Sequence, residues 1–264
     1  KYIAYTDHIQ QLWMTEVATG TTTLVDREPY LHPERTINPV WSPDSKWIAY
    51  AKRLNSQYHA IMAYSLDQAK AIQLTDGMSD AVSPAWDASG KYVYFMASTN
   101  YALRSGWLDM SSIERPLRRS VYLVVLKKGD PSPLLPESDE EKTAPKDEPK
   151  KDSATATKQK KKDAGKPEAE APKLVVQIDT NGISQRILAL GMPPREYTDL
   201  KTGMEGEVFV AEAVQNQDGY TLHKYTLKDR KSEVFLSPLY YHSFSADGKK
   251  LLYKSGQTWG IVDA

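Results

Sequence analysis

The chain has 264 residues, and its 34 basic and 34 acidic side chains give a formal net charge of zero. This balance disfavours a protein that binds nucleic acid through bulk charge, and no apolar run approaches the roughly 18 residues of a membrane helix. Cysteine is absent, which excludes disulfides and thiolate zinc sites.

A ten-residue segment recurs along the chain. Residues 41–50 read WSPDSKWIAY, residues 86–95 read WDASGKYVYF and residues 244–253 read FSADGKKLLY. Each copy joins an aromatic strand end, a tight polar turn and a second apolar strand. The first two copies start 45 positions apart (86 minus 41), and a period of about 40–45 residues with several strands is typical of β-propeller blades.

In chain order, the pattern predicts an all-β fold with about five four-stranded propeller blades, of which the first and last are partial. The predicted strands of blades one to three lie near 2–5, 11–17 and 22–25, near 38–41, 47–52, 58–65 and 71–74, and near 83–86, 92–97 and 120–126. The strands of blades four and five lie near 206–212, 220–227 and 232–236, and near 240–244, 250–254 and 258–262. Between them, residues 174–178 and 183–190 flank an Asn-Gly pair, which predicts a hairpin.

Residues 137–172 interrupt the pattern with ten acids, nine lysines and no aromatic residue. Such a segment buries too little apolar surface to offset chain entropy, so we expect a disordered charged insertion in blade three. A lysine-rich nucleic-acid-binding tail is the alternative. The predicted domains are residues 1–136 with blades one to three, residues 137–172 with the insertion, and residues 173–264 with the remainder.

The chain starts within a predicted strand and stops just after one. We therefore expect a fragment of a longer polypeptide and of a larger propeller with six or seven blades.

The long connections are predicted to share one face of the propeller, where binding residues usually lie. The longest, residues 98–119, is rich in the side chains of interaction surfaces. Its candidate peptide- or partner-binding residues are Arg104, Trp107, Arg115, Arg118 and Arg119. The alternative is a loop that folds back over its own blade. Asp44 and Asp247 lie in the repeat turns, where a turn-stabilising role is favoured over a metal site.

Catalytic motifs are absent from the sequence. The five histidines show no metal-ligand spacing, and neither a Gly-x-Ser-x-Gly elbow nor a Ser-x-x-Lys motif occurs. We therefore assign no catalytic residue, no metal site and no cofactor.

The repeat WSPD-x-K-x-IAY, with Gln73-Leu74-Thr75 at the outer strand, resembles the PD40 repeat of TolB-like propellers. Residues 94–141, 177–197 and 256–264 are similar to bacterial homologues of Tricorn protease, a serine peptidase of the S41 type. The resemblance implies a parent enzyme with N-terminal propellers, a helical segment, a PDZ domain and a catalytic domain. The family's catalytic serine and histidine have no matching positions in this chain.

The resemblance further implies a propeller that binds or channels peptides for proteolysis by a catalytic domain absent from this chain. The expected partners are peptides or unfolded polypeptide and the other domains of the parent hydrolase; a homo-oligomer stays open, whereas nucleic acid and membrane insertion are not expected. The expected compartment is the periplasm, with the cytoplasm as alternative. Two other functions stay open, a non-enzymatic TolB-like interaction scaffold and a carbohydrate-binding propeller.

Overall fold

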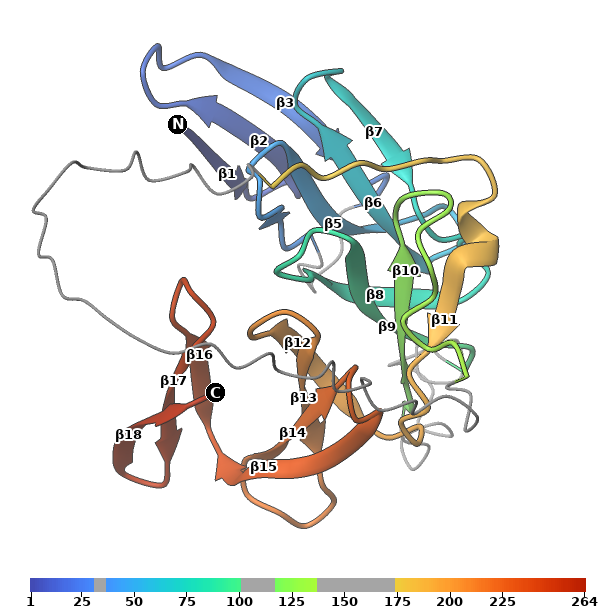
Figure 1. The fold of residues 1–264 in the computed structure, drawn as a ribbon. Coiled ribbons are helices and arrows are strands. Elements are labelled where there is room, and N and C mark those ends of the chain that lie inside the picture. The colour runs from blue at the N-terminus through green and yellow to red at the C-terminus, as the bar shows by residue number, and fades with distance from the viewer. Residues whose placement is uncertain (31–36, 101–116, 137–173) are drawn as a thin grey trace, which may run out of the picture. The chain divides into compact units, whose positions relative to one another are not determined.

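The computed structural model describes residues 1–30, 37–100, 117–136 and 174–264. The chain divides into a unit of residues 1–134 and 174–264 and a second unit of residues 135–173. All strands of the described residues belong to the first unit, where they form five antiparallel sheets (Figure 1).

Each sheet is one blade, and its strands are ordered as they occur in the chain. Blade one contains β1 (Tyr2–Thr6), β2 (Gln11–Glu16) and β3 (Thr22–Arg27). Blade two contains β4 (Val40–Trp41), β5 (Trp47–Arg53), β6 (His59–Ser65) and β7 (Lys70–Gln73). Blade three contains β8 (Asp80–Trp86), β9 (Tyr92–Ser98), β10 (Ser120–Val125) and β11 (Ile187–Ala189).

Blade four contains β12 (Tyr197–Thr202), β13 (Glu207–Ala213), β14 (Tyr220–Thr226) and β15 (Lys231–Leu239). Blade five contains β16 (Tyr241–Phe244), β17 (Lys250–Ser255) and β18 (Thr258–Asp263). The all-β prediction is therefore confirmed, as are the five blades with three strands in the first and in the last.

The repeat turns are stabilised by short polar side chains. In the first copy the Ser42 hydroxyl donates to Asp44 at 2.6 Å, and the Lys46 amide donates to the same carboxylate oxygen at 3.1 Å. In the last copy Ser245 donates to Asp247 at 2.6 Å, and the hydrogen bond from Ser245 lowers the pKa of the Asp247 carboxyl. Asp44 and Asp247 thus have the turn-stabilising role that the sequence predicts.

These turns also need one residue with positive φ. Gly248 has a φ of 72°, and a Cβ there would meet the backbone of Gly203 at 2.7 Å. Ser45 occupies the corresponding position of the first copy with a φ of 59°. Glycine adopts this conformation without steric cost, which explains the Asp-Gly pair of the last copy.

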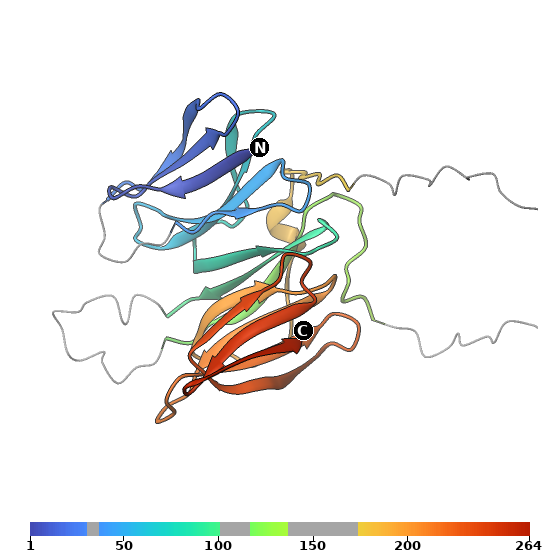
Figure 2. The same cartoon turned by 90° about the vertical axis from the view of Figure 1, so that its left-hand side faces the viewer.

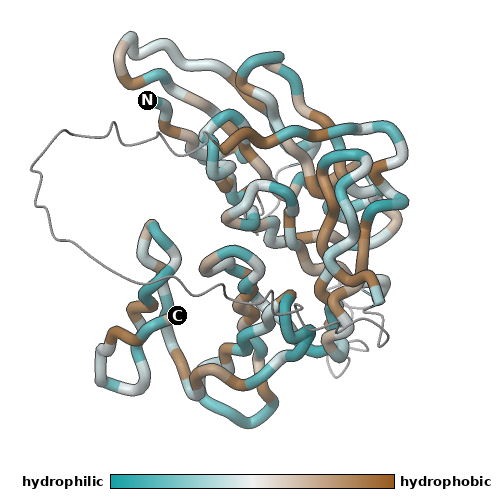
Figure 3. The backbone as a smooth tube through the Cα atoms, in the orientation of Figure 1, coloured by the Kyte–Doolittle hydropathy of each residue, from teal (hydrophilic) through white to brown (hydrophobic). Residues whose placement is uncertain are grey.

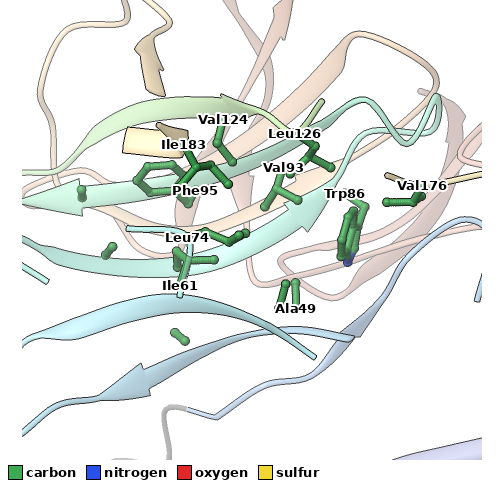
Figure 4. Packing of buried hydrophobic residues seen from close by; sticks show 14 residues of the cluster. Ala49, Ile61, Leu74, Trp86, Val93, Phe95, Val124, Leu126, Val176 and Ile183 are labelled. Carbon is green, nitrogen blue, oxygen red and sulfur yellow. The ribbon is translucent and has the colours of Figure 1, made fainter. Parts of the chain in front are cut away.

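Neighbouring blades pack face to face through four apolar clusters. Leu12 and Tyr50 belong to the cluster between blades one and two, and Phe209 and Leu251 to the cluster between blades four and five. Figure 4 shows the cluster between blades two and three, where Trp86 also donates its indole N–H to the carbonyl of Val40 at 3.0 Å. Side chains alternate between the two faces of a strand, so each middle blade contributes to two clusters.

The predicted hairpin around Asn181-Gly182 is wrong. Residues 174–178 form no strand, and η3 (Ile183–Arg186), a short 3-10 helix, precedes β11. The guanidinium of Arg186 donates to the carbonyls of Val125, Leu126, Asn181 and Asp179, which ties the segment to the end of β10. The segment after Asn181-Gly182 therefore pairs with β10, which is distant in the sequence, and not with residues 174–178 as the local turn signal predicts.

The inner strand β12 is absent from the sequence prediction. Its sequence YTDLKT is mostly polar, and only two of its six residues, Tyr197 and Leu200, are buried. An apolar pattern cannot reveal such a strand. Figure 2 shows the five sheets following one another in chain order, and Figure 3 shows hydrophobic colour along many strands and hydrophilic colour at many turns.

Candidate functional site

The connections between strands fall into two sets, because successive strands in a blade run in opposite directions. One set contains the repeat turns. The other set contains the connections β1–β2, β3–β4, β5–β6, β7–β8, β9–β10, β11–β12, β13–β14, β15–β16 and β17–β18. We call the strand ends next to this second set the long-loop face.

Polar side chains are buried beneath the long-loop face of several blades. They are Gln10, Glu28, Arg53, His59, Asp80, Ser98, Thr221 and His223. Charged groups are rarely fully buried unless they have partners, because removal from water is costly. A concentration of them at one end of the blades is therefore the most notable feature of the described residues.

Asp80 is central to this group. It begins β8, has no exposed surface, and lies 2.5 Å through Oδ1 from Nδ1 of His59. The same oxygen accepts the backbone N–H of His59 at 3.1 Å. On its other side, Oδ2 is 3.8 Å from Nη2 of Arg119. Asp80 thereby connects the start of β6 in blade two with the start of β10 in blade three.

Arg119 extends this network to blade four. Its Nη1 donates to the carbonyl of Tyr197 at 3.0 Å, and its backbone pairs with Arg195 through hydrogen bonds of 2.8 and 3.2 Å. Burial raises the pKa of Tyr197 to about 12, so its hydroxyl stays protonated and donates to the carbonyl of Pro193 at 3.0 Å. Residues of blades three and four therefore fix the position of the Arg119 guanidinium.

Blades one and two are joined by a second set of charges. The Arg53 amide donates to Glu28 at 3.2 Å, and Lys52 forms an ion pair of 2.6 Å with Asp26. The Tyr50 hydroxyl also donates to Asp26 at 2.7 Å, and burial raises the pKa of this tyrosine. This set stabilises the contact between the two blades.

Blade four has its own cluster near the same face. Glu212 accepts hydrogen bonds from Nε2 of His223 at 2.6 Å and from Arg195 at 2.9 Å. At the junction with blade five, Tyr220 Oη lies 2.6 Å from Nδ1 of His242, whose Nε2 is 3.9 Å from Asp199.

The contacts of His242 predict a pH dependence of stability. Burial lowers the pKa of His242 below its ordinary 6.5, and Asp199 opposes this shift in part. Below pH 6.5 the unfolded chain binds a proton at this imidazole that the folded chain does not, so stability falls as the pH falls towards the folded-state pKa. We expect His242→Gln to lose less stability than the parent chain between pH 7.5 and 5.5, measured as urea midpoints.

His8→Gln, which changes an exposed imidazole, is the matched control and should keep the parent's pH dependence. The carboxyls of Asp7, Asp179 and Asp247 titrate in a lower window, because their pKa values lie below 3.8. Equal losses for His242→Gln and the parent chain would refute the assignment.

The His59–Asp80 pair has the composition of a catalytic dyad but not the accessibility of one. His59 is 2% exposed and Asp80 is 0% exposed, so a substrate cannot reach either group. The pair therefore acts as a connection between blades. Within the described residues, no group of three or more potential metal ligands occurs, and no helix has the length and apolarity that crossing a bilayer requires.

Comparison with known families decides the identity of this propeller. The family model of the Tricorn protease second beta propeller domain matches residues 1–264. The chain belongs to this family. Its blades are therefore those of a Tricorn propeller domain.

Two curated relatives have names consistent with this family. The Tricorn protease homolog of Saccharolobus solfataricus is 26% identical over 98 residues, and the putative Tricorn-like protease C-terminal subunit of Sulfurisphaera tokodaii is 28% identical over 98 residues. Both alignments cover 37% of this chain, and they cover 9% and 11% of the relatives. The aligned part is thus about a tenth of either relative.

Solved structures agree on the fold. The crystal structure of the tricorn protease superimposes with a TM-score of 0.67 at 18% identity, covering 99% of this chain and 24% of that chain. TolB from Acinetobacter baumannii gives a TM-score of 0.54 at 14% identity, covering 99% and 50%. At these identities the likeness establishes the propeller fold alone.

Of the five candidate binding residues predicted from the sequence, only Arg118 and Arg119 lie among the residues that the structure describes. Arg118 is exposed, whereas Arg119 is half-buried and held by Asp80 and Tyr197. Arg104, Trp107 and Arg115 lie outside the described residues, as does the predicted insertion at 137–172. The sequence interpretation missed His59 and Asp80, because 21 positions separate them and neither belongs to a recognisable motif.

Proposed function

We propose that this chain is the substrate-handling propeller region of a Tricorn-like serine peptidase. The observation that carries the proposal is the match of the Tricorn propeller family model to residues 1–264. Because the sequence has no recognisable nucleophile–base motif, peptide cleavage is assigned to a catalytic domain outside this chain. The propeller binds peptides or unfolded polypeptide and directs them to that domain.

The long-loop face is the proposed binding face. Its loops are carried by a scaffold that buried charges tie together across blades, which favours precise placement of loop residues. The sequence resemblance alone supports three further assignments of the parent protein. They are the S41 type of serine peptidase, a bacterial origin and export to the periplasm. The two named relatives are archaeal proteins.

The proposal predicts that loop substitutions weaken peptide binding. Arginine and tryptophan are enriched among residues whose truncation costs about 2 kcal/mol or more at interfaces, a loss of about 30-fold in affinity. We expect Trp107→Ala and Arg118→Ala to weaken the binding of a fluorescein-labelled unstructured peptide to this extent, measured by fluorescence anisotropy.

The matched control is Arg230→Ala, which removes an exposed arginine at the β14–β15 connection on the opposite face. It should bind like the parent chain. If the chain binds no unstructured peptide but captures a folded protein, the TolB-like scaffold is the better assignment. If Arg230→Ala alone weakens binding, the working face has been assigned to the wrong end of the blades.

A further inference from the structure

A cavity of about 240 Å³ lies at the inner strands of three consecutive blades. Its walls come from β4, β8 and β12, and from Arg119 just before β10. Both β4 and β12 contact β8. Pockets for complete drug-sized ligands measure about 300–1,000 Å³, so this cavity suits one side chain or one chain terminus.

Two β-bulges shape the lining. The register of β8 against β9 moves from Val82 opposite Met96 to Ala85 opposite Tyr94, so one extra residue is accommodated at Ser83-Pro84. Ser83 has a φ of 54°, a conformation that non-glycine residues seldom adopt.

The register of β12 against β13 moves from Tyr197 opposite Glu212 to Asp199 opposite Ala211, so the extra residue is Thr198. Bulges frequently lie next to binding sites, where they redirect side chains. In this cavity the lining includes the bulged residues of both strands, Ser83 and Thr198, which carry hydroxyl groups.

The lining is rich in hydrogen-bond donors. Besides the Ser83 hydroxyl it contains the amide of Asn38, the guanidinium of Arg119 and the ammonium of Lys201. The Thr198 hydroxyl donates to the carbonyl of Ala211 at 3.4 Å. Asp199 is the one carboxylate among the lining residues. This composition favours a ligand that accepts hydrogen bonds and carries negative charge.

The two cations differ in how firmly they are held. Arg119 is positioned by the carbonyl of Tyr197 and by Asp80, so a ligand meets it without a large loss of side-chain entropy. Lys201 is 3.7 Å from Asp199, and both side chains are exposed enough (52% and 39%) that their ion pair is weak. Lys201 is therefore free to turn towards a ligand.

We propose that this cavity is a subsite for a carboxylate group of an extended peptide. The carboxylate belongs to the C-terminus or to an aspartate or glutamate side chain, and both sources present the same planar anion to Arg119 and Lys201. The inference rests on the proposed function, because it names the feature of a peptide that the propeller selects.

Four fluorescein-labelled peptides of one sequence test the inference. They carry an internal Glu or Gln, combined with a free or an amidated C-terminus. We expect at least one type of carboxylate to bind the chain about tenfold more tightly than the doubly neutral peptide, which corresponds to one charge-assisted hydrogen bond. A preference for the Glu peptides over the Gln peptides identifies a side-chain carboxylate as the ligand. A preference for the free C-terminus over the amidated one identifies the terminal carboxylate.

Lys201→Gln should remove most of this preference, measured as the ratio of the affinities for the charged and the doubly neutral peptide. Lys46→Gln is the matched control, because Lys46 is 53% exposed, pairs with Asp67 at 3.2 Å and lies in a repeat turn on the opposite face. Arg119→Lys keeps the charge but not the planar fork, and it should also weaken the preference in a chain whose circular dichroism matches the parent.

Equal affinity of the parent chain for all four peptides would overturn the carboxylate subsite and leave the proposed function intact. A preference that survives in Lys201→Gln would likewise overturn the placement in this cavity. Absence of binding by every peptide would overturn the proposed function together with the subsite.

Discussion

Replacing Asp80 by alanine is expected to destabilise the propeller by about 3–5 kcal/mol, the usual cost of removing one partner of a buried ion pair. The carboxylate has no exposed surface, accepts two hydrogen-bonding contacts from His59, and faces Arg119. Without it, a buried imidazole and a largely buried guanidinium lose their common acceptor. For a domain of this size, about 2–4 °C per kcal/mol gives a melting temperature lower by about 6–20 °C.

The measurement is a thermal melt followed by circular dichroism. Asp80→Asn keeps the shape and one acceptor oxygen, so it should show a smaller loss and covers the case in which Asp80→Ala does not fold. Asp67→Ala is the matched control, because that carboxylate is 69% exposed and its ion pair with Lys46 contributes about 0–1 kcal/mol. Similar losses for Asp80→Ala and Asp67→Ala would contradict the central role of Asp80.

Replacing Phe209 by alanine is expected to cost a comparable 3–5 kcal/mol, the range for a buried phenylalanine. Phe209 lies on β13 with no exposed surface, and its ring centroid is 5.3 Å from that of Phe235 and 4.7 Å from that of Phe244. Because Phe244 belongs to β16, the substitution weakens the contact between blades four and five. Both the free energy of unfolding of the chain and the protection of the blade-five amides from hydrogen exchange should fall.

Urea unfolding measures the first effect, and amide hydrogen exchange at Leu251 measures the second. Val234→Ala on β15 is the control, because Val234 is 60% exposed and should change stability by less than about 0.5 kcal/mol. Phe209→Leu should lie between the two. If exchange at Leu251 is unchanged in Phe209→Ala while global stability falls, the phenylalanine stabilises blade four alone.

The arrangement of the binding face was only partly predictable. Arg118 and Arg119 are adjacent in the sequence and have the same chemistry, yet one is exposed and the other is held by Asp80 and Tyr197. Their different roles follow from the alternation of side chains at the entrance of β10 and from the presence of blade four beside it. Neither property can be read from the residue types.

Local signals in the sequence determined the blades themselves. The repeat that contains Trp41 and Trp86 predicts the two-strand unit correctly, because alternating apolar residues and polar turn residues act over a few positions. Where an inner strand is polar, as in β12, this signal is weak and the strand was missed.

Only the tertiary structure decided the contacts between blades. Arg119 and the Tyr197 carbonyl are 78 positions apart, with the charged segment 137–172 between them in the sequence. Arg186 likewise contacts Val125, 61 positions away, and this contact replaces the hairpin that Asn181-Gly182 favours locally. Burial makes such long-range hydrogen bonds and ion pairs stronger than the turn preferences of short segments, and burial is set by the packing of whole blades.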